Sequence, residues 1–383
     1  MNKVFDINRF DEKFTSTELF VVKALFRGER ISNASSYSED EVLKYSAQNG
    51  VAALLYKRLS EADDGSIPDK LLQRLKNEYL KTLVQNTNLL NKAVKINSLL
   101  EKNGVPVVFL KGIIVAPFCY KDTALRPMSD IDLLIPEPEV QKAYDLLLSE
   151  GAVKADPVEK DHPSNHHLPM IVFKSAPVEV HRFLTSKDSD YFIPPDDIFK
   201  NRILWSDGKF ALPAPSYVDI FIYMIVHVYY TFLRGGMRLS WMYDFLLLQG
   251  MVDVKSSEFT TRVKEWKVEY PVLLMLTLLE LLNGRQPSFP GWESEKRLMQ
   301  DILLSVSYMH EEPADSMLLS YRLIWEQIKN AEGIENKLKI FRTKLFRRSD
   351  ENILSRFWKL SGRFTGMLYN STKLSIKRYF GKY

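Results

Sequence analysis

Two aspartates set two residues apart, Asp130 and Asp132, are the side chains in this sequence best suited to chemistry. They stand in the run 128–135, where polar and apolar residues alternate in a way that predicts a β-strand. Because successive strand side chains point to opposite faces, both carboxylates would share one face, while Ile131 and Leu133 enter a core. Two like charges so placed repel, and a hard divalent cation such as Mg²⁺ is the usual compensation. A polar edge of a half-buried strand is the other explanation.

Polar residues of three further segments lie on predicted elements around this strand. Lys111 and Gly112 follow a short apolar run and precede a helix, where a glycine allows a phosphate to approach the backbone; a simple turn explains the pair equally well. Arg126, four residues before Asp130, could reach a triphosphate or pair with an acid. Glu179 lies between two valines on a predicted central strand, where a charged residue is usually functional or paired with a metal.

Four histidines and Asp244 are weaker candidates for a functional role. His166 and His167 are adjacent, so their side chains would point to opposite sides of an extended chain and make poor co-ligands of one metal; a phosphate contact of one of them and a solvated loop are both open. His181 shares a face with Glu179, and both a substrate contact and an ordinary buried hydrogen bond remain open. His227 lies in an apolar helix and is predicted to be a core histidine, and Tyr223 is predicted to pack in the same helix. Asp244 is predicted to be structural.

The elements that must position these residues alternate in type. Helical periodicity fills the first hundred residues, with an interruption expected at Asn49–Gly50, and includes a long helix from about Pro68 to Lys102. Strands are then predicted at 105–110 and 128–135, followed by hairpins at 170–181 and 204–212. Helices return at Ser216, which has the pattern of an N-cap, and continue to about residue 331. A small mixed β-sheet flanked by helices is an α+β fold.

Composition fits an ordinary globular protein with a substantial core. The 383 residues are 45% hydrophobic and 26% charged. The single cysteine, Cys119, excludes an intrachain disulfide and fits a reducing compartment. The first residues lack a signal-peptide pattern, and the apolar runs 220–233 and 271–282 are too short to span a bilayer. We therefore expect a cytoplasmic protein.

Charge is distributed unevenly along the chain. Residues 336–383 hold 13 Lys/Arg against two acids, so the first 335 residues carry a net charge of −7 within a total of +4. Aromatic residues alternate with the basic ones in this tail. Such a segment can dock on an acidic body, lie peripherally on an anionic membrane or bind nucleic acid, and we expect these in that order.

Three of these segments together resemble the nucleotidyltransferase superfamily of DNA polymerase β, and more closely a bacterial group of uncharacterised nucleotidyltransferase family proteins. In that group a strand ending in Leu-Lys-Gly precedes an Arg-x-x-x-Asp-Ile-Asp-Leu-Leu strand and then a Val-Glu-x-His strand. The matching segments here are Leu110–Gly112, Arg126–Leu134 and Val178–His181. Many members of the superfamily have Gly-Ser or Gly-Gly after the first strand, whereas Gly112 is followed by Ile113.

The resemblance implies a Mg²⁺-dependent transfer (with Mn²⁺ as a substitute) of a nucleoside monophosphate from a nucleoside triphosphate to an acceptor that the sequence does not identify. ATP is the triphosphate we favour. Catalysis and metal binding would fall to Asp130, Asp132 and Glu179. Nucleotide contacts would fall to Lys111, Gly112, Arg126, Ser129 and His181.

We expect four parts: an N-terminal helical region (1–103), the nucleotidyltransferase core (104–212), a C-terminal helical domain (213–335) and the basic aromatic tail (336–383). One alternative keeps the fold without efficient catalysis, as a nucleotide-binding scaffold that the tail recruits to an anionic partner. Another is an enzyme that modifies nucleic-acid ends, although the acidic body disfavours it.

Overall fold

The computed structural model describes eight segments of the chain, residues 7–29, 37–62, 67–120, 122–159, 161–163, 165–187, 189–287 and 296–310. Contacts divide the chain into two compact units, Met1–Ser320 and Tyr321–Tyr383, and every described residue belongs to the first. The predicted basic tail at 336–383, and the part of the predicted C-terminal helices beyond residue 310, lie outside the described residues.

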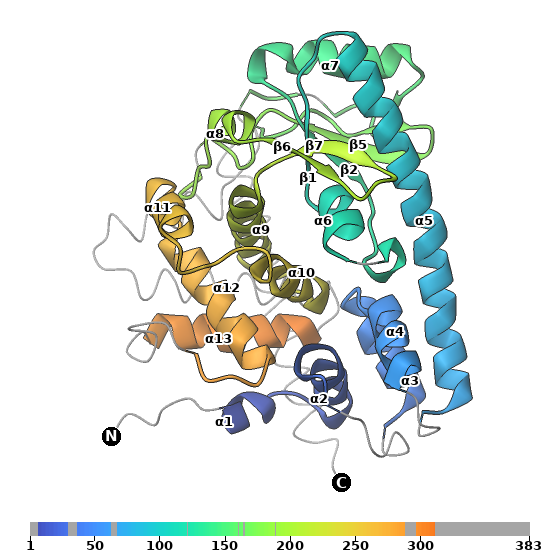
Figure 1. Ribbon diagram of the computed structural model, residues 1–383, viewed down its shortest axis with the longest axis vertical. Coiled ribbons are helices and arrows are strands. Elements are labelled where there is room, and N and C mark those ends of the chain that lie inside the picture. The colour runs from blue at the N-terminus through green and yellow to red at the C-terminus, as the bar shows by residue number, and fades with distance from the viewer. Residues whose placement is uncertain are drawn as a thin grey trace, which may run out of the picture. The chain divides into compact units, whose positions relative to one another are not determined.

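The first unit has an α+β fold, as predicted (Figure 1). Its α-helices are α1 (Ile7–Asp11), α2 (Ser16–Val22), α3 (Glu39–Gln48), α4 (Ala52–Ala62), α5 (Asp69–Lys102), α6 (Gly112–Cys119), α7 (Val140–Ser149), α8 (Pro195–Lys200), α9 (Tyr217–Phe232), α10 (Leu239–Gln249), α11 (Ser257–Glu265), α12 (Glu269–Leu282) and α13 (Lys296–His310). Shorter turns are the π-helix η1 (Lys23–Arg27) and the 3₁₀ helices η3 (Thr123–Leu125) and η4 (Glu137–Glu139).

Five strands form one mixed sheet, in the order β1-β2-β5-β4-β3. They are β1 (Val108–Leu110), β2 (Ile131–Leu134), β3 (Val153–Lys154), β4 (Ile171–Phe173) and β5 (Ala176–His181). The two central strands, β2 and β5, run parallel, and β1, β4 and β3 pair antiparallel with their neighbours. The predicted hairpin at 204–212 forms a separate two-stranded sheet of β6 (Ile203–Ser206) and β7 (Ala211–Ala214).

Core packing explains why the central strands have their apolar pattern. Ile131 and Leu133 on β2, and Val178 and Val180 on β5, have no exposed surface. Their alternation places the intervening side chains, Asp132 among them, on the other face of the sheet. The buried face thus fixes the strand register, since a slip of one residue would exchange the two faces.

The N-terminal helices support the loop that leads into β2. Helices α3 and α4 separate at Asn49–Gly50, as predicted, because Gly50 takes a left-handed φ of 67°. The long helix α5 confirms the predicted helix and contacts η3, β5 and β7. Its buried Asn86 donates to the backbone carbonyl of Arg126 (2.8 Å) and accepts from the backbone N–H of Met128 (3.2 Å). An amide of α5 thereby holds the residues that precede Asp130.

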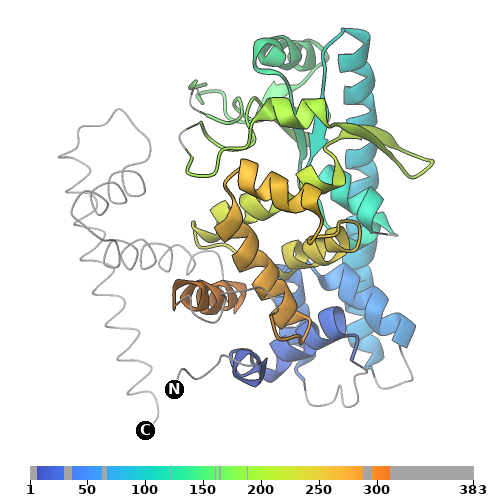
Figure 2. The same ribbon diagram turned by 60° about the vertical axis from the view of Figure 1, so that its left-hand side comes forward.

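Helices α9, α10 and α12 pack against one another in the second half of the unit, as Figure 2 shows. The predicted N-cap is confirmed, since the Ser216 hydroxyl accepts a hydrogen bond from the backbone N–H of Asp219 at 3.1 Å. Most of α9 and α12 is buried, as expected from their apolar sequences. Within the described residues, no helix is both long enough and apolar enough to cross a bilayer.

Candidate active site

Parallel pairing of the two central strands brings the candidate carboxylates together. Asp132 of β2 lies directly beside Glu179 of β5 in the register, and Leu134 lies beside His181. Asp132 is buried and Glu179 is half-buried. Residues 47 positions apart in sequence therefore present oxygens to the same region.

Lys111 is the cation nearest to this carboxylate pair. Its Nζ donates to Asp132 Oδ1 at 2.7 Å and lies 3.7 Å from Glu179 Oε2. Burial alone would lower the pKa of this amine, but Asp132, Tyr223 and Glu179 together raise it, so Lys111 remains charged. Its backbone has a φ of 56°, which is rare for a residue with a side chain. Strained backbone of this kind is characteristic of functional sites.

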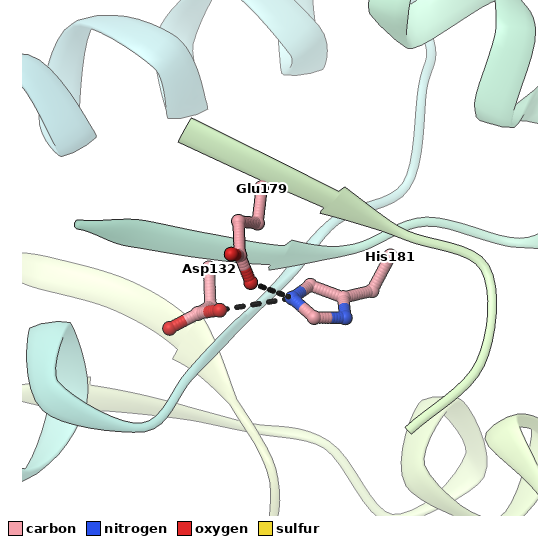
Figure 3. A group of neighbouring side chains, drawn as sticks. All are labelled: Asp132, Glu179 and His181. Atoms are coloured by element: carbon pink, nitrogen blue, oxygen red, sulfur yellow. Dashed lines mark hydrogen bonds and ion pairs between the residues drawn. The ribbon is translucent and has the colours of Figure 1, made fainter. Parts of the chain in front are cut away.

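His181 completes the group, and Figure 3 shows its ring facing both carboxylates. Its Nε2 lies 2.8 Å from Asp132 Oδ1 and 3.2 Å from Glu179 Oε2, so Nε2 carries a proton. Burial and the Lys111 charge lower the pKa of this imidazole, but the hydrogen bonds to both carboxylates raise it overall. The opposite ring nitrogen, Nδ1, is buried and has no hydrogen-bond partner among the described residues.

The three carboxylates differ in pKa. Burial works against the charge of Asp132, but Lys111 and His181 outweigh it and lower its pKa. A hydrogen bond from His181 lowers the pKa of Glu179. Burial, followed by repulsion from Asp132, raises the pKa of Asp130 to about 6. Such divergent shifts within one site are characteristic of functional groups.

Asp132, Glu179 and His181 have the geometry of a metal-binding group. Their ligand atoms all lie within 4.8 Å of one another. Two carboxylates and an imidazole suit a divalent cation, and the Lys111 ammonium already places positive charge at the same oxygens. The residues present therefore fit a metal ion. Asp130 is not one of the three, because β2 begins at Ile131 and leaves Asp130 in the preceding loop. The expectation that both aspartates lie on the strand was wrong in this respect.

Arg126 lies beside the site in a closed ion pair. Its Nε and Nη2 donate to the two carboxylate oxygens of Asp244 at 2.9 Å each, and Tyr120 donates to the same carboxylate at 2.9 Å. Arg126 and Asp244 are both buried. Arg126 was expected either to reach a triphosphate or to pair with an acid, and in the structure it pairs with Asp244. Asp244 is structural, as predicted.

Gly112 is adjacent to the same guanidinium. A Cβ at this position would lie 2.5 Å from Arg126 Nη1, a separation that side chains do not tolerate. Close approach of Arg126 is thus sufficient to require a glycine here. Ser129 is exposed, and its side chain hydrogen-bonds the carboxylate of Asp130.

Three further residues lie near this site, and two of them, Tyr223 and His227, were interpreted from the sequence as core residues. Tyr223 is fully buried on α9, and its hydroxyl has no hydrogen-bond partner among the described residues. His227 follows one helical turn later, with its ring centroid 6.2 Å from that of Tyr223. His166 lies 5.4 Å from His181, ring to ring. Tyr223 and His227 are four residues apart, a spacing that puts both side chains on one face of the helix. In a helix whose other residues are mostly apolar, this spacing does not show that the face lines a site.

Comparisons with known proteins place the chain in a family. Residues 35–284 match the family described as uncharacterised nucleotidyltransferase, and the chain belongs to that family. The predicted class of protein, a nucleotidyltransferase, is therefore confirmed. The sequence matches no curated protein.

Solved structures of nucleotidyltransferases are also similar to this chain. The solution structure of the antibiotic-resistance factor ANT(2″)-Ia shares 9% identity and a TM-score of 0.37, covering 49% of this chain and 96% of that protein. A crystal structure of ANT(2″)-Ia with adenylyl-2″-tobramycin shares 10% identity and a TM-score of 0.34, with 46% and 95% coverage. An antigenic nucleotidyltransferase-like protein from Paracoccidioides brasiliensis shares 14% identity and a TM-score of 0.30, with 52% and 94% coverage.

Proposed function

We propose that this nucleotidyltransferase moves a nucleoside monophosphate from a nucleoside triphosphate, with ATP favoured, to an acceptor hydroxyl or similar nucleophile. The observation that carries the proposal is the register of the sheet. It sets Asp132 directly beside Glu179, with Lys111 and His181 in contact with both.

The proposed reaction is a substitution at the α-phosphorus. The acceptor oxygen forms a bond to that phosphorus, the bond to the β-bridging oxygen breaks, and pyrophosphate leaves with the electron pair. Glu179 receives the acceptor proton, since it is half-buried and its lowered pKa keeps it ionised at neutral pH. Lys111 supplies a fixed positive charge for the phosphate oxygens, which Lys binds as a point charge.

We propose Asp130, Asp132 and Glu179 as ligands of Mg²⁺, or of Mn²⁺ in its place, with His181 orienting the last two. When bound, the metal would stabilise negative charge on the phosphoryl oxygens and make the acceptor a better nucleophile. Asp132 and Glu179 contribute oxygens within the group of three described above, and Asp130 adds a third carboxylate from the adjoining loop. Ser129 would hold that third carboxylate by its hydrogen bond.

An experiment with labelled triphosphates tests the proposal. The protein is incubated with each α-³²P-labelled nucleoside triphosphate, Mg²⁺ and cell extract, and the label is located in protein, nucleic acid or small molecules. Transfer should depend on Asp132 and Glu179, and should persist in the matched control Asp145→Ala, which removes an exposed carboxylate on α7. Equal labelling by wild type and by Asp130→Ala/Asp132→Ala would overturn the proposal.

One observation favours a second candidate, a nucleotide-binding scaffold without efficient catalysis. The Lys111 ammonium lies within 3.7 Å of both carboxylates, so it competes with a metal for the same oxygens. This candidate predicts triphosphate binding with no transfer by the wild type. It also predicts a gain in metal affinity for Lys111→Met, measured by Mn²⁺ titration.

The remaining expectations on place and partners are proposals too. The lone cysteine supports a cytoplasmic location, and the basic composition of residues 336–383 supports peripheral contact with an anionic membrane or nucleic acid. Cell fractionation tests the location. Replacing the basic residues of the tail by Gln should abolish salt-sensitive sedimentation with anionic vesicles or RNA.

A further inference from the structure

Near the carboxylates lie polar side chains that the proposed transfer does not yet use. They come from α9 and from the segment before β4: Tyr223, His227 and His166. The buried hydroxyl of Tyr223 has no hydrogen-bond partner among the described residues, and the two histidines are half-buried. Buried polar groups normally find partners, because leaving one unpaired costs about 1–3 kcal/mol. An unpaired group beside a reaction site therefore points to a ligand.

Tyr223 is the most constrained of them. It is completely buried, and its hydroxyl can donate one hydrogen bond. Burial raises its pKa, Lys111 opposes that shift, and Asp132 and Glu179 add to it. The hydroxyl is therefore protonated at neutral pH. It also lies close enough to the carboxylates and to Lys111 to feel the charge of each.

The imidazoles of His227 and His166 are both uncharged. Burial, followed by Lys111, lowers the pKa of His227 to about 3. Burial, followed by His181, lowers the pKa of His166 to about 2, and Lys111 and Arg234 contribute. Each ring is therefore neutral and offers one N–H donor. Neutral N–H donors and the unpaired hydroxyl of Tyr223, near the Lys111 ammonium, can hydrogen-bond the oxygens of an anion.

Arg126, one of the residues first expected to contact the nucleotide, is engaged elsewhere. Asp244 occupies the guanidinium of Arg126 through both oxygens, and that guanidinium lies against Gly112. A triphosphate carries two more phosphates than the one that is transferred. Donors for those two have to come from another part of the site, and the buried hydroxyl of Tyr223 on α9 is a donor without a partner among the described residues.

We propose that Tyr223 and His227 of α9, together with His166, bind the two terminal phosphates of the nucleoside triphosphate. This inference rests on the proposed function. As the bond to the β-bridging oxygen breaks, the departing pyrophosphate keeps the electron pair, and these donors hydrogen-bond its oxygens. The Lys111 ammonium contacts both carboxylates and acts electrostatically on His227, so its charge can also neutralise the departing phosphate oxygens.

Binding of inorganic tripolyphosphate and of adenosine to the full chain, measured by calorimetry, tests the inference. The variants are Tyr223→Phe and His227→Gln, each of which keeps the size of the side chain. Tyr217→Phe is the matched control, since it removes an exposed hydroxyl from the first turn of the same helix. We expect the dissociation constant for tripolyphosphate to rise about 10-fold in each variant, with adenosine binding unchanged. The KM for the triphosphate and the inhibition constant of pyrophosphate should rise in parallel.

The outcomes separate this inference from the proposed function. Wild-type affinity for tripolyphosphate in both variants would overturn the inference and leave nucleotidyl transfer intact, as would an equal loss for adenosine and tripolyphosphate. The inference would also be overturned, and nucleotidyl transfer left intact, if the wild type transferred the label but did not bind tripolyphosphate. Selective loss of tripolyphosphate binding in a protein that transfers no label would support the inference and refute the proposed function. If one variant fails to fold, the other decides.

Discussion

Two buried clusters that each pair a cation with a carboxylate lie side by side in this protein, and they differ in how completely their atoms are paired. In the cluster of Arg126, Asp244 and Tyr120, both oxygens of the carboxylate accept charge-assisted hydrogen bonds. In the cluster of Lys111, Asp132, Glu179 and His181, one histidine nitrogen has no partner among the described residues. Glu179 is also partly open to solvent. The first cluster is closed and the second is open.

This difference separates a structural ion pair from a reaction site. A buried ion pair whose hydrogen bonds are all made fixes a conformation, and it has little capacity left for a ligand. An open cluster keeps unused donors and acceptors at a cost in stability, which a ligand can offset. Gly112 joins the two clusters, since it follows Lys111 and contacts Arg126. We therefore expect damage to the closed cluster to appear as lost stability, and damage to the open one as lost activity.

The largest effect should come from breaking the closed cluster. Asp244→Asn leaves the Arg126 charge buried without its counter-ion, which should lower the free energy of unfolding by about 3–5 kcal/mol. Urea denaturation measures the change. Glu137→Gln, in the exposed pair with Lys187 (3.1 Å), is the matched control and should cost less than about 1 kcal/mol. Equal costs for the two substitutions would show that the closed cluster does not stabilise the fold.

Asp132→Asn tests the open cluster. It should reduce nucleotidyl transfer by about 10²- to 10³-fold, as is typical when one group that stabilises transition-state charge is removed. The loss of stability should be smaller than for Asp244→Asn, because Glu179 remains 3.7 Å from Lys111. Labelled transfer and urea denaturation of the same sample give both numbers. Retained activity with a large loss of stability would reverse the roles assigned to the two clusters.

The sequence was enough to predict the fold because its local signals agree. Apolar alternation gave the central strands, and Ser216 and Asn49–Gly50 marked helix ends that the structure has. The family motifs that contain Asp132 and Glu179 also predicted that these two side chains lie close together. The sequence did not show that β2 begins after Asp130, since a polar residue at a strand end has the same alternation as one inside the strand.

Pairings between distant segments were beyond the reach of sequence patterns. Arg126 and Asp244 are 118 residues apart, and no local periodicity links them. Tyr223 and His227 were interpreted as packing residues, because an apolar helix gives no sign of which polar side chain faces a site. The histidines at 166 and 167 were expected on opposite sides of the chain, yet their rings are in edge contact, with centroids 4.5 Å apart. An irregular segment does not obey the alternation of a strand.

A side chain at the junction should disturb both clusters by a smaller amount. Gly112→Ala places a methyl group 2.5 Å from Arg126 Nη1, so the guanidinium must move from Asp244. We expect a stability loss of about 1–3 kcal/mol, the usual cost of overpacking. The double variant Arg126→Met/Asp244→Leu removes the obstacle, and Gly112→Ala should cost less in that background. An identical cost in both backgrounds would place the strain elsewhere, for instance in the Lys111 turn.

The smallest effect is a pH dependence that arises at the open cluster. His227 is kept neutral by burial and by the Lys111 charge, which lower its pKa to about 3 in the folded protein, while an unfolded histidine titrates near 6.5. The unfolded state therefore binds more protons below pH 6.5, so this residue lowers the stability as the pH falls from about 6.5 towards 3. Between pH 7 and pH 5.5 the loss should be about 1 kcal/mol. Urea denaturation at both pH values should show this loss in the wild type and a smaller one in His227→Gln, whereas parallel losses would mean that His227 is protonated in the folded protein.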